Sequence, residues 1–189
     1  ATEHEDMLGF SDTIFPGFLF AMGMAVPFAI ENRFKKGDTT GQVAVHIFWR
    51  TVALLVMGLF TVNRDTIDAT ATGISKPWFS ILMVLAFFLV WSVYPKVSGL
   101  RKWLFTAMKL LGVAILAYLF YRYRGVNGSS FSPQWWGILG LIGWTYLVCA
   151  SIYLLIRSDL TLNLIALGLM LGCSVCSEAG LFSTIGFIQ

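Results

Sequence analysis

Charged residues are scarce in this sequence, and their scarcity excludes a water-soluble protein. Only 12% of the 189 residues are charged and 57% are hydrophobic, with a mean hydropathy of +0.76. In soluble proteins about a quarter of the residues are charged, and a soluble domain as poor in charge as this one would aggregate. The apolar segments follow one another with short connections, so we expect one transmembrane domain over residues 1–189.

Several functional signatures are also missing. The formal net charge is only +3 and forms no basic stripe, which argues against a nucleic-acid partner. The three cysteines lie in apolar stretches, so a secreted disulfide framework is not indicated. Cys173 and Cys176 form a C-x-x-C without a second pair or a nearby histidine, which favours helix packing over a metal site. P-loop, G-x-S-x-G and H-E-x-x-H motifs do not occur.

Six apolar runs are present, each about long enough to cross a bilayer. They cover residues 12–30, 43–62, 78–94, 103–121, 135–156 and 160–177. Trp and Tyr gather near their ends, as amphipathic rings do at a membrane interface. The sequence predicts an all-α, polytopic transmembrane bundle in contact with a lipid bilayer. Pro16 and Pro27 predict that the first helix is kinked or interrupted.

Basic residues predict the orientation of the bundle. Connections after the first, third and fifth segments hold more Lys and Arg than those after the second and fourth, which places the first set in the cytoplasm. Residue 1 is then extracytoplasmic, and we expect a bacterial inner membrane. The opening ATEHED has no basic and apolar signal-peptide regions, and an outside start implies a preceding helix. The final EAGLFSTIGFIQ resembles the start of another segment, so we expect a larger bundle with helices before and after this chain. A homo-oligomer is compatible with the sequence.

Two residues at the extracytoplasmic start could carry chemistry. His4 can exchange protons near neutral pH or accept an acyl group, although a lone terminal histidine is more often inert. Asp12 opens the first apolar run, where a carboxylate can act in a site or can cap the free backbone N–H groups of a helix. Spacing alone favours capping for Asp12.

The cytoplasmic side offers a basic cluster. Arg33 and Lys36 follow the first segment, and His46 and Arg50 lie one turn apart in the second. Together they could hold phosphate groups. Positive-inside anchoring explains the loop charges equally well, but Arg50 lies deeper than anchoring needs.

These residues resemble a known family. The run DTIFPGFLFAMG from Asp12 to Gly23, followed by Pro27 and the basic turn, is similar to the opening of multi-pass transmembrane acyltransferases typified by heparan-α-glucosaminide N-acetyltransferase. Trp49-Arg50-Thr51, with Asn63 closing the helix, resembles the next block of that family. The later run GISKPWFSILMVLAFFLVW looks more like a bacterial branch of the superfamily with a domain of unknown function.

The resemblance implies transfer of an acetyl group from cytoplasmic acetyl-CoA to a sugar or glycan acceptor on the far side of the membrane. It implies a catalytic histidine in a pattern His-x-x-Trp-x-Gly ahead of the Asp. His4 and Gly9 keep that spacing, whereas Met7 replaces the Trp. A secondary transporter of a small solute is the alternative, which the prolines of the first segment and the charges within later ones favour.

Overall fold

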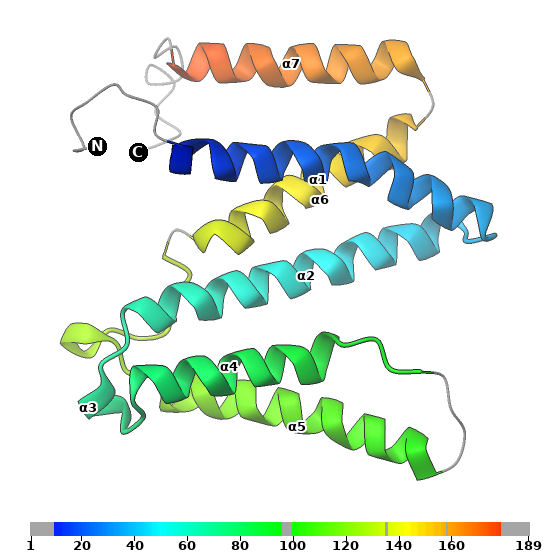
Figure 1. Cartoon of the computed structure of the whole chain (residues 1–189). Helices are drawn as coiled ribbons and strands as arrows, with labels where there is room; N and C mark the ends of the chain where they lie inside the picture. The colour runs from blue at the N-terminus through cyan, green and yellow to red at the C-terminus, as the bar shows by residue number, and fades with distance from the viewer. Residues whose placement is uncertain (1–9, 96–99, 135, 158, 179–189) are drawn as a thin grey trace. The chain divides into compact units, whose positions relative to one another are not determined.

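The computed structural model describes residues 10–95, 100–134, 136–157 and 159–178. These residues form seven α-helices and a short 3-10 helix, with no strand among them (Figure 1). The helices are α1 (Phe10–Lys35), α2 (Thr40–Asp65), α3 (Ala69–Thr72), α4 (Lys76–Trp91), α5 (Leu100–Arg122), η1 (Val126–Gly128), α6 (Gly137–Ile156) and α7 (Leu160–Glu178). The predicted all-α class is confirmed. Each of the six predicted segments corresponds to a helix, and α3 is an addition.

Four of these helices are long and apolar enough to span a membrane. They are α1, α2, α5 and α6, whereas α4 and the apolar part of α7 are shorter. Polar residues extend several helices beyond the predicted apolar runs. Together, length and composition identify an integral membrane protein.

Helix α1 continues through both of its prolines. Pro16 and Pro27 lie inside a helix of 26 residues, so the segment is not interrupted, and its ribbon bends toward the C-terminal end (Figure 1). A proline removes one backbone hydrogen bond without ending a helix when neighbouring turns hold the chain. Asp12 is the third residue of α1 rather than its first.

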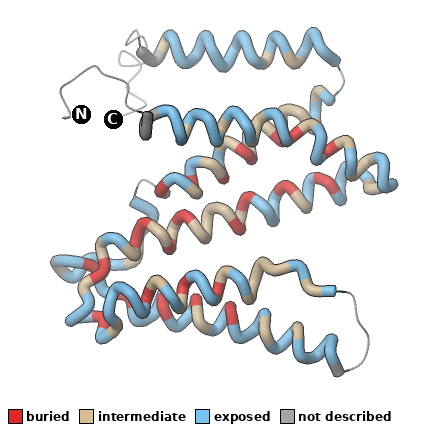
Figure 2. The backbone as a smooth tube through the Cα atoms, viewed as in Figure 1, coloured by how far each residue is buried: buried red, intermediate tan, exposed pale blue. Residues whose placement is uncertain are grey.

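The chain divides into two compact units. The first contains Ala1–Phe48 and Thr145–Gln189, and the second contains Trp49–Trp144. The first unit therefore holds α1, the beginning of α2, most of α6 and α7. Its buried side chains come from α1, α2 and α6: Val26, Ile30, Val43, Ile47, Tyr146 and Ala150. The side chains of α7 are mostly exposed (Figure 2).

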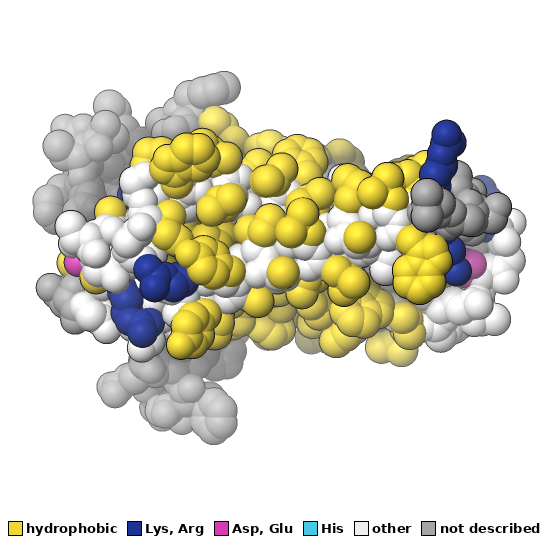
Figure 3. All heavy atoms as spheres, turned by 90° about the horizontal axis from the view of Figure 1, so that it is seen from below, with side chains coloured by type: hydrophobic (Ala, Val, Ile, Leu, Met, Phe, Trp, Pro, Cys, Tyr) yellow, Lys and Arg dark blue, Asp and Glu magenta, His cyan; other side chains and the backbone are white. Residues whose placement is uncertain are grey.

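The second unit is organised around the α4–α5 hairpin. Helices α4 and α5 pack against each other, and Phe79, Met83 and Leu119 are buried in its apolar core. A Cβ atom on Gly112 would lie 2.8 Å from the Cβ of Leu89, so glycine allows this close contact. On the face seen in Figure 3, hydrophobic side chains cover the middle of the hairpin and Lys and Arg lie toward its ends.

Helices α2 and α6 also cross closely in the second unit. A Cβ atom on Gly58 would press on the backbone nitrogen of Gly140 and lie 2.6 Å from the carbonyl oxygen of Trp136. Backbone atoms cannot rotate away as a side chain can, so only glycine fits at residue 58. The crossing is of the small-residue type common in membrane bundles.

A neutral hydrogen-bond network closes one end of the second unit. Asn63 is fully buried, and its Nδ2 donates to the carbonyl oxygens of Leu59 and Ser132, each at 2.7 Å, while the Ser132 N–H donates to its Oδ1 at 3.2 Å. Thr72 donates to the carbonyl oxygen of Arg124 at 3.0 Å and accepts from its N–H. These bonds join the end of α2 and helix α3 to the segment after α5.

Candidate functional site

The residues expected to bind phosphate lie where α1 and α2 meet. Arg33 is in the last turn of α1, and Lys36 follows that helix directly. Gly37, with a φ of 91°, turns the chain back toward α2, because glycine adopts positive φ without steric cost. His46 lies in the second turn of α2. The short turn therefore brings Arg33 and His46 together.

Arg33 makes two side-chain contacts at this turn. Its Nη1 donates to Asp38 Oδ2 at 2.8 Å, and its Nη2 lies 3.0 Å from Nδ1 of His46. Since a guanidinium can only donate, Nδ1 of His46 is the acceptor in this contact. The side chains of Arg33 and Asp38 are 35% and 30% exposed. The pair is accessible to water and to a ligand that competes with Asp38.

A second ion pair joins α6 to α1 at the same end of the first unit. The Nε of Arg157 donates to Glu31 Oε1 at 3.2 Å, and its guanidinium carbon lies 3.8 Å from the centre of the Phe34 ring. The planar guanidinium is suited both to the ring face and to the carboxylate.

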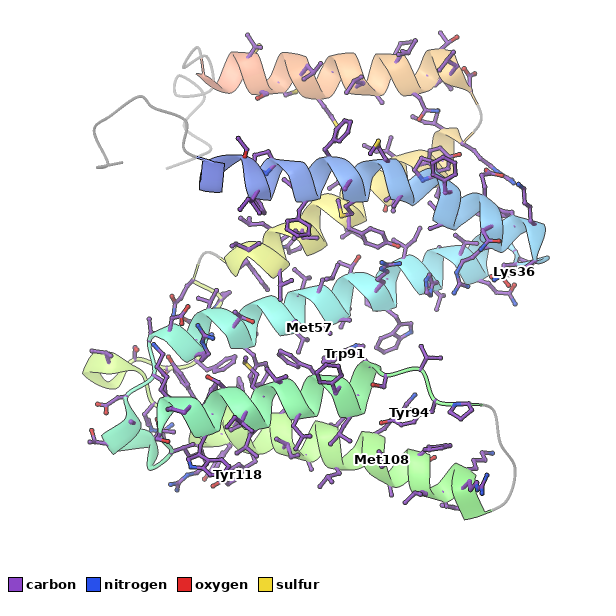
Figure 4. The ribbon with its side chains drawn as sticks, in the orientation of Figure 1. Lys36, Met57, Trp91, Tyr94, Met108 and Tyr118 are labelled. Carbon is purple, nitrogen blue, oxygen red and sulfur yellow. The ribbon has the colours of Figure 1, made fainter. Side chains whose placement is uncertain are left out.

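We call this group of side chains the basic end of the first unit. Its basic members are Arg33, Lys35, Lys36 and Arg157, and its acidic members are Glu31, Asp38 and Asp159. Lys35 and Lys36 are exposed, and no ion pair involves either of them in the described part of the chain. Lys36 points away from the helices at the turn (Figure 4). These two lysines could meet an anion without first losing a partner.

The other sequence candidates lie elsewhere. Asp12 is at the opposite end of α1 from Arg33. Arg50 is an exposed residue of α2, one turn after His46, and belongs to the second unit. His4 lies outside the described residues. The structure therefore brings together Arg33, Lys36 and His46 of the six residues that the sequence singled out.

Arg157, the basic residue after the fifth segment, contributed only to the predicted orientation, and no role was predicted for Glu31 or Asp38. A signal for Asp38 was present, because an acid five residues after Arg33 across a glycine turn can reach back to it. The Arg157–Glu31 pair had no such signal, since the two residues are 126 positions apart. Among the described residues, no three His, Cys, Asp or Glu side chains lie close enough to hold a metal ion.

The family model for Domain of unknown function (DUF5009) matches residues 5–182. The chain belongs to this family. The DUF5009 match covers both units and every helix described above. Comparisons with curated proteins and with solved structures find no match.

Proposed function

We propose that this chain belongs to a membrane acyltransferase, which moves an acetyl group from cytoplasmic acetyl-CoA to a sugar or glycan acceptor on the extracytoplasmic side. The observation that carries the proposal is the arrangement of candidate groups along α1. Arg33 and Lys36 lie at one end of this helix, and Asp12 lies near the other. At 1.5 Å per residue, Asp12 and Arg33 are about 30 Å apart, roughly the thickness of a hydrocarbon core.

The basic end suits the phosphates of acetyl-CoA. Asp38 already places a carboxylate oxygen 2.8 Å from Arg33, and a phosphate oxygen could take the same position, because guanidinium binds both groups in similar geometry. Lys35 and Lys36 add positive charge that the carboxylates do not neutralise. Arg50 lies one turn beyond His46 on α2. Its position in the apolar run is deeper than anchoring needs, so the proposal keeps it as a candidate phosphate contact.

At the other end, His4 would act on the acceptor. As a general base it would take a proton from the attacking amine or hydroxyl, or as a nucleophile it would carry the acetyl group itself. Asp12 lies in the first turn of α1, where a carboxylate can orient an imidazole or a sugar hydroxyl. The resemblance of the sequence from Asp12 to Gly23 to transmembrane acyltransferases supports these roles.

The experiment is acetyl transfer by the purified, intact protein in lipid nanodiscs. Radiolabelled acetyl-CoA is supplied with a panel of amino sugars, and we expect labelled sugar from the wild type and none from His4→Ala. Label retained on the wild-type protein without an acceptor, and lost in His4→Ala, indicates the covalent route. Arg64→Ala, which removes a basic residue of the second unit, is the matched control and should transfer normally.

The same experiment can also overturn the proposal. Acetyl-CoA that neither binds nor turns over in the intact protein would overturn the acyltransferase proposal. Uptake of a labelled solute into proteoliposomes, tested with the same preparation, would then support the transporter alternative.

A further inference from the structure

A cavity of about 280 Å³ lies among three helices of the first unit. Its lining includes Gly23 and Pro27 of α1, Cys149 and Tyr153 of α6, and Asn163 and Ala166 of α7. Apolar side chains form the rest of its wall. It contains none of the residues assigned above to phosphate binding or to the acceptor.

Pro27 leaves one backbone carbonyl of α1 without its helical donor. Pro27 has no N–H, so it cannot donate the helical hydrogen bond to the carbonyl oxygen of Gly23, four residues earlier. Both residues line the cavity. In a hydrocarbon environment, a carbonyl group without a donor is costly. A ligand with an N–H group would remove that cost.

Two side chains of the cavity can also accept hydrogen bonds. The Nδ2 of Asn163 already donates to the carbonyl oxygens of Arg157 at 3.0 Å and Asp159 at 2.8 Å, which leaves its Oδ1 to accept. Tyr153 also lines the cavity, and a hydroxyl oxygen can accept a hydrogen bond. A cavity with apolar walls and several acceptors selects an uncharged ligand that carries N–H donors, and amides meet this description.

The cavity is adjacent to the basic end. Tyr153 lies in the last turn of α6, four residues before Arg157, and Asn163 donates a hydrogen bond to the carbonyl oxygen of Arg157. Pro27 lies six residues before Arg33, about 9 Å along α1. A ligand that placed phosphates on the basic end would have to continue as an uncharged chain to enter the cavity.

We propose that this cavity holds the uncharged, amide-bearing arm of the acyl-CoA donor. The arm has two amide N–H groups for the Gly23, Asn163 and Tyr153 oxygens, and it would carry the thioester inward along α1 from the basic end. This inference rests on the proposed function, and it adds the site that the arm occupies.

Filling the cavity tests the inference. Gly23 lines the cavity, and a Cβ atom there would meet nothing within 4 Å. Gly23→Leu therefore adds bulk at the cavity wall without a clash at its Cβ. We expect acetyl-CoA to bind this variant about tenfold more weakly in isothermal titration of the intact protein in nanodiscs, because the arm loses its buried contacts. The adenosine bisphosphate portion of coenzyme A, which lacks the arm, should bind as in the wild type.

Gly17→Leu is the matched control. Gly17 lies in the same helix, a Cβ atom there also meets nothing within 4 Å, and Gly17 is not among the lining residues. It should leave both affinities unchanged. Ala166→Leu fills the cavity from α7 and should reproduce the effect of Gly23→Leu. Normal binding of the adenosine bisphosphate confirms that each variant is folded.

The outcomes separate the two proposals. Wild-type protein that binds neither acetyl-CoA nor the adenosine bisphosphate overturns the proposed function, and this inference with it. Wild-type protein that binds both, with unchanged acetyl-CoA affinity in Gly23→Leu and Ala166→Leu, overturns the inference alone. That result would also follow if a lipid chain, rather than the donor arm, occupied the cavity.

Discussion

The two units differ in how far their polar side chains are buried and in whether these side chains are charged. In the second unit, Asn63 and Thr72 are almost completely buried and make neutral hydrogen bonds to backbone atoms of another segment. In the first unit, Arg33 and Arg157 are charged, and their side chains remain 35% and 44% exposed. The first arrangement fixes how the chain segments meet. The second leaves charged groups that can exchange partners.

The energies of the two kinds of contact differ accordingly. Leaving a buried polar group unpaired costs about 1–3 kcal/mol, whereas an exposed ion pair contributes about 0–1 kcal/mol. The second unit should therefore lose stability when its contacts are removed, and the first should lose binding. Four variants, taken from the largest expected effect to the smallest, test this division.

The largest effect is expected from Gly58→Ala in the second unit. The new methyl group would press on the backbone of Gly140 and on the Trp136 carbonyl, so α2 and α6 must separate. We expect a loss of about 3 kcal/mol in the free energy of unfolding, the upper part of the range for overpacking, measured by unfolding in mixed detergent micelles. Gly168→Ala is the control, since nothing lies within 4 Å of a Cβ atom there. Equal stability of the two variants would show that the crossing is not close.

Asn63→Leu should have the second-largest effect. It leaves the Ser132 N–H and carbonyl group without their side-chain partner, and we expect a loss of about 2 kcal/mol in the same unfolding assay. Thr61→Val is the control, because the Thr61 hydroxyl bonds only to the carbonyl oxygen of Met57 in its own helix. A loss no larger than that of Thr61→Val would contradict the bridging role of Asn63.

Arg33→Gln should separate binding from stability. Because its ion pair is partly exposed, we expect the free energy of unfolding to fall by less than about 1 kcal/mol. Acetyl-CoA affinity, measured by titration calorimetry, should fall about tenfold or more, since charge-assisted bonds to a phosphate are strong. Arg64→Gln, which breaks the 2.6 Å pair with Asp65 in the second unit, should leave the affinity unchanged. Unchanged acetyl-CoA affinity in Arg33→Gln would show that Arg33 only anchors the helix at the membrane surface and does not bind phosphate.

The smallest effect concerns the exposed cap of α3. The Thr70 hydroxyl, then the backbone N–H groups of Ala71 and Thr70, hold the pKa of Asp68 below its ordinary value. A lowered pKa in the folded state adds stability above the unfolded-state pKa, and this stability is lost as the pH falls through the folded value. We expect a small fall in the wild-type melting temperature below about pH 4.

Asp68→Asn should flatten that part of the pH profile, because an amide does not titrate. Thr70→Val removes the largest cause of the shift and should flatten it partly. A wild-type profile that matches that of Asp68→Asn would show that the cap adds no pH-dependent stability.

The number and approximate position of the long helices could be predicted from the sequence, because a helix that crosses a bilayer needs a long apolar run. The ends of the helices could not be predicted in the same way. The segment predicted to end at Ile30 continues to Lys35, because the helical hydrogen bonds continue into the polar residues that follow the apolar run. Helix α3 could not be found from hydropathy. It is four residues long and depends on the Asp68 cap and on Gly73 with a φ of 71°.

Local parts of the site were predictable and distant ones were not. Arg33, Lys36 and His46 lie around one short turn, so their proximity follows from the sequence. The partners of Arg157 and Asn63 lie 126 and 69 residues away, and no local pattern identifies contacts at that distance. The cavity in the first unit could not be predicted from the sequence either, because its lining residues come from three helices, α1, α6 and α7.

The crossing at Gly58 also sets an order of events during synthesis. Helices α4 and α5 are neighbours in the chain and can pack as soon as both are in the membrane. Gly58, by contrast, meets its partner only after α6 has been made, with the whole hairpin inserted in between. The α4–α5 hairpin can therefore form while the Gly58 face of α2 is still in contact with lipid. The second unit is complete only when α6 has been inserted.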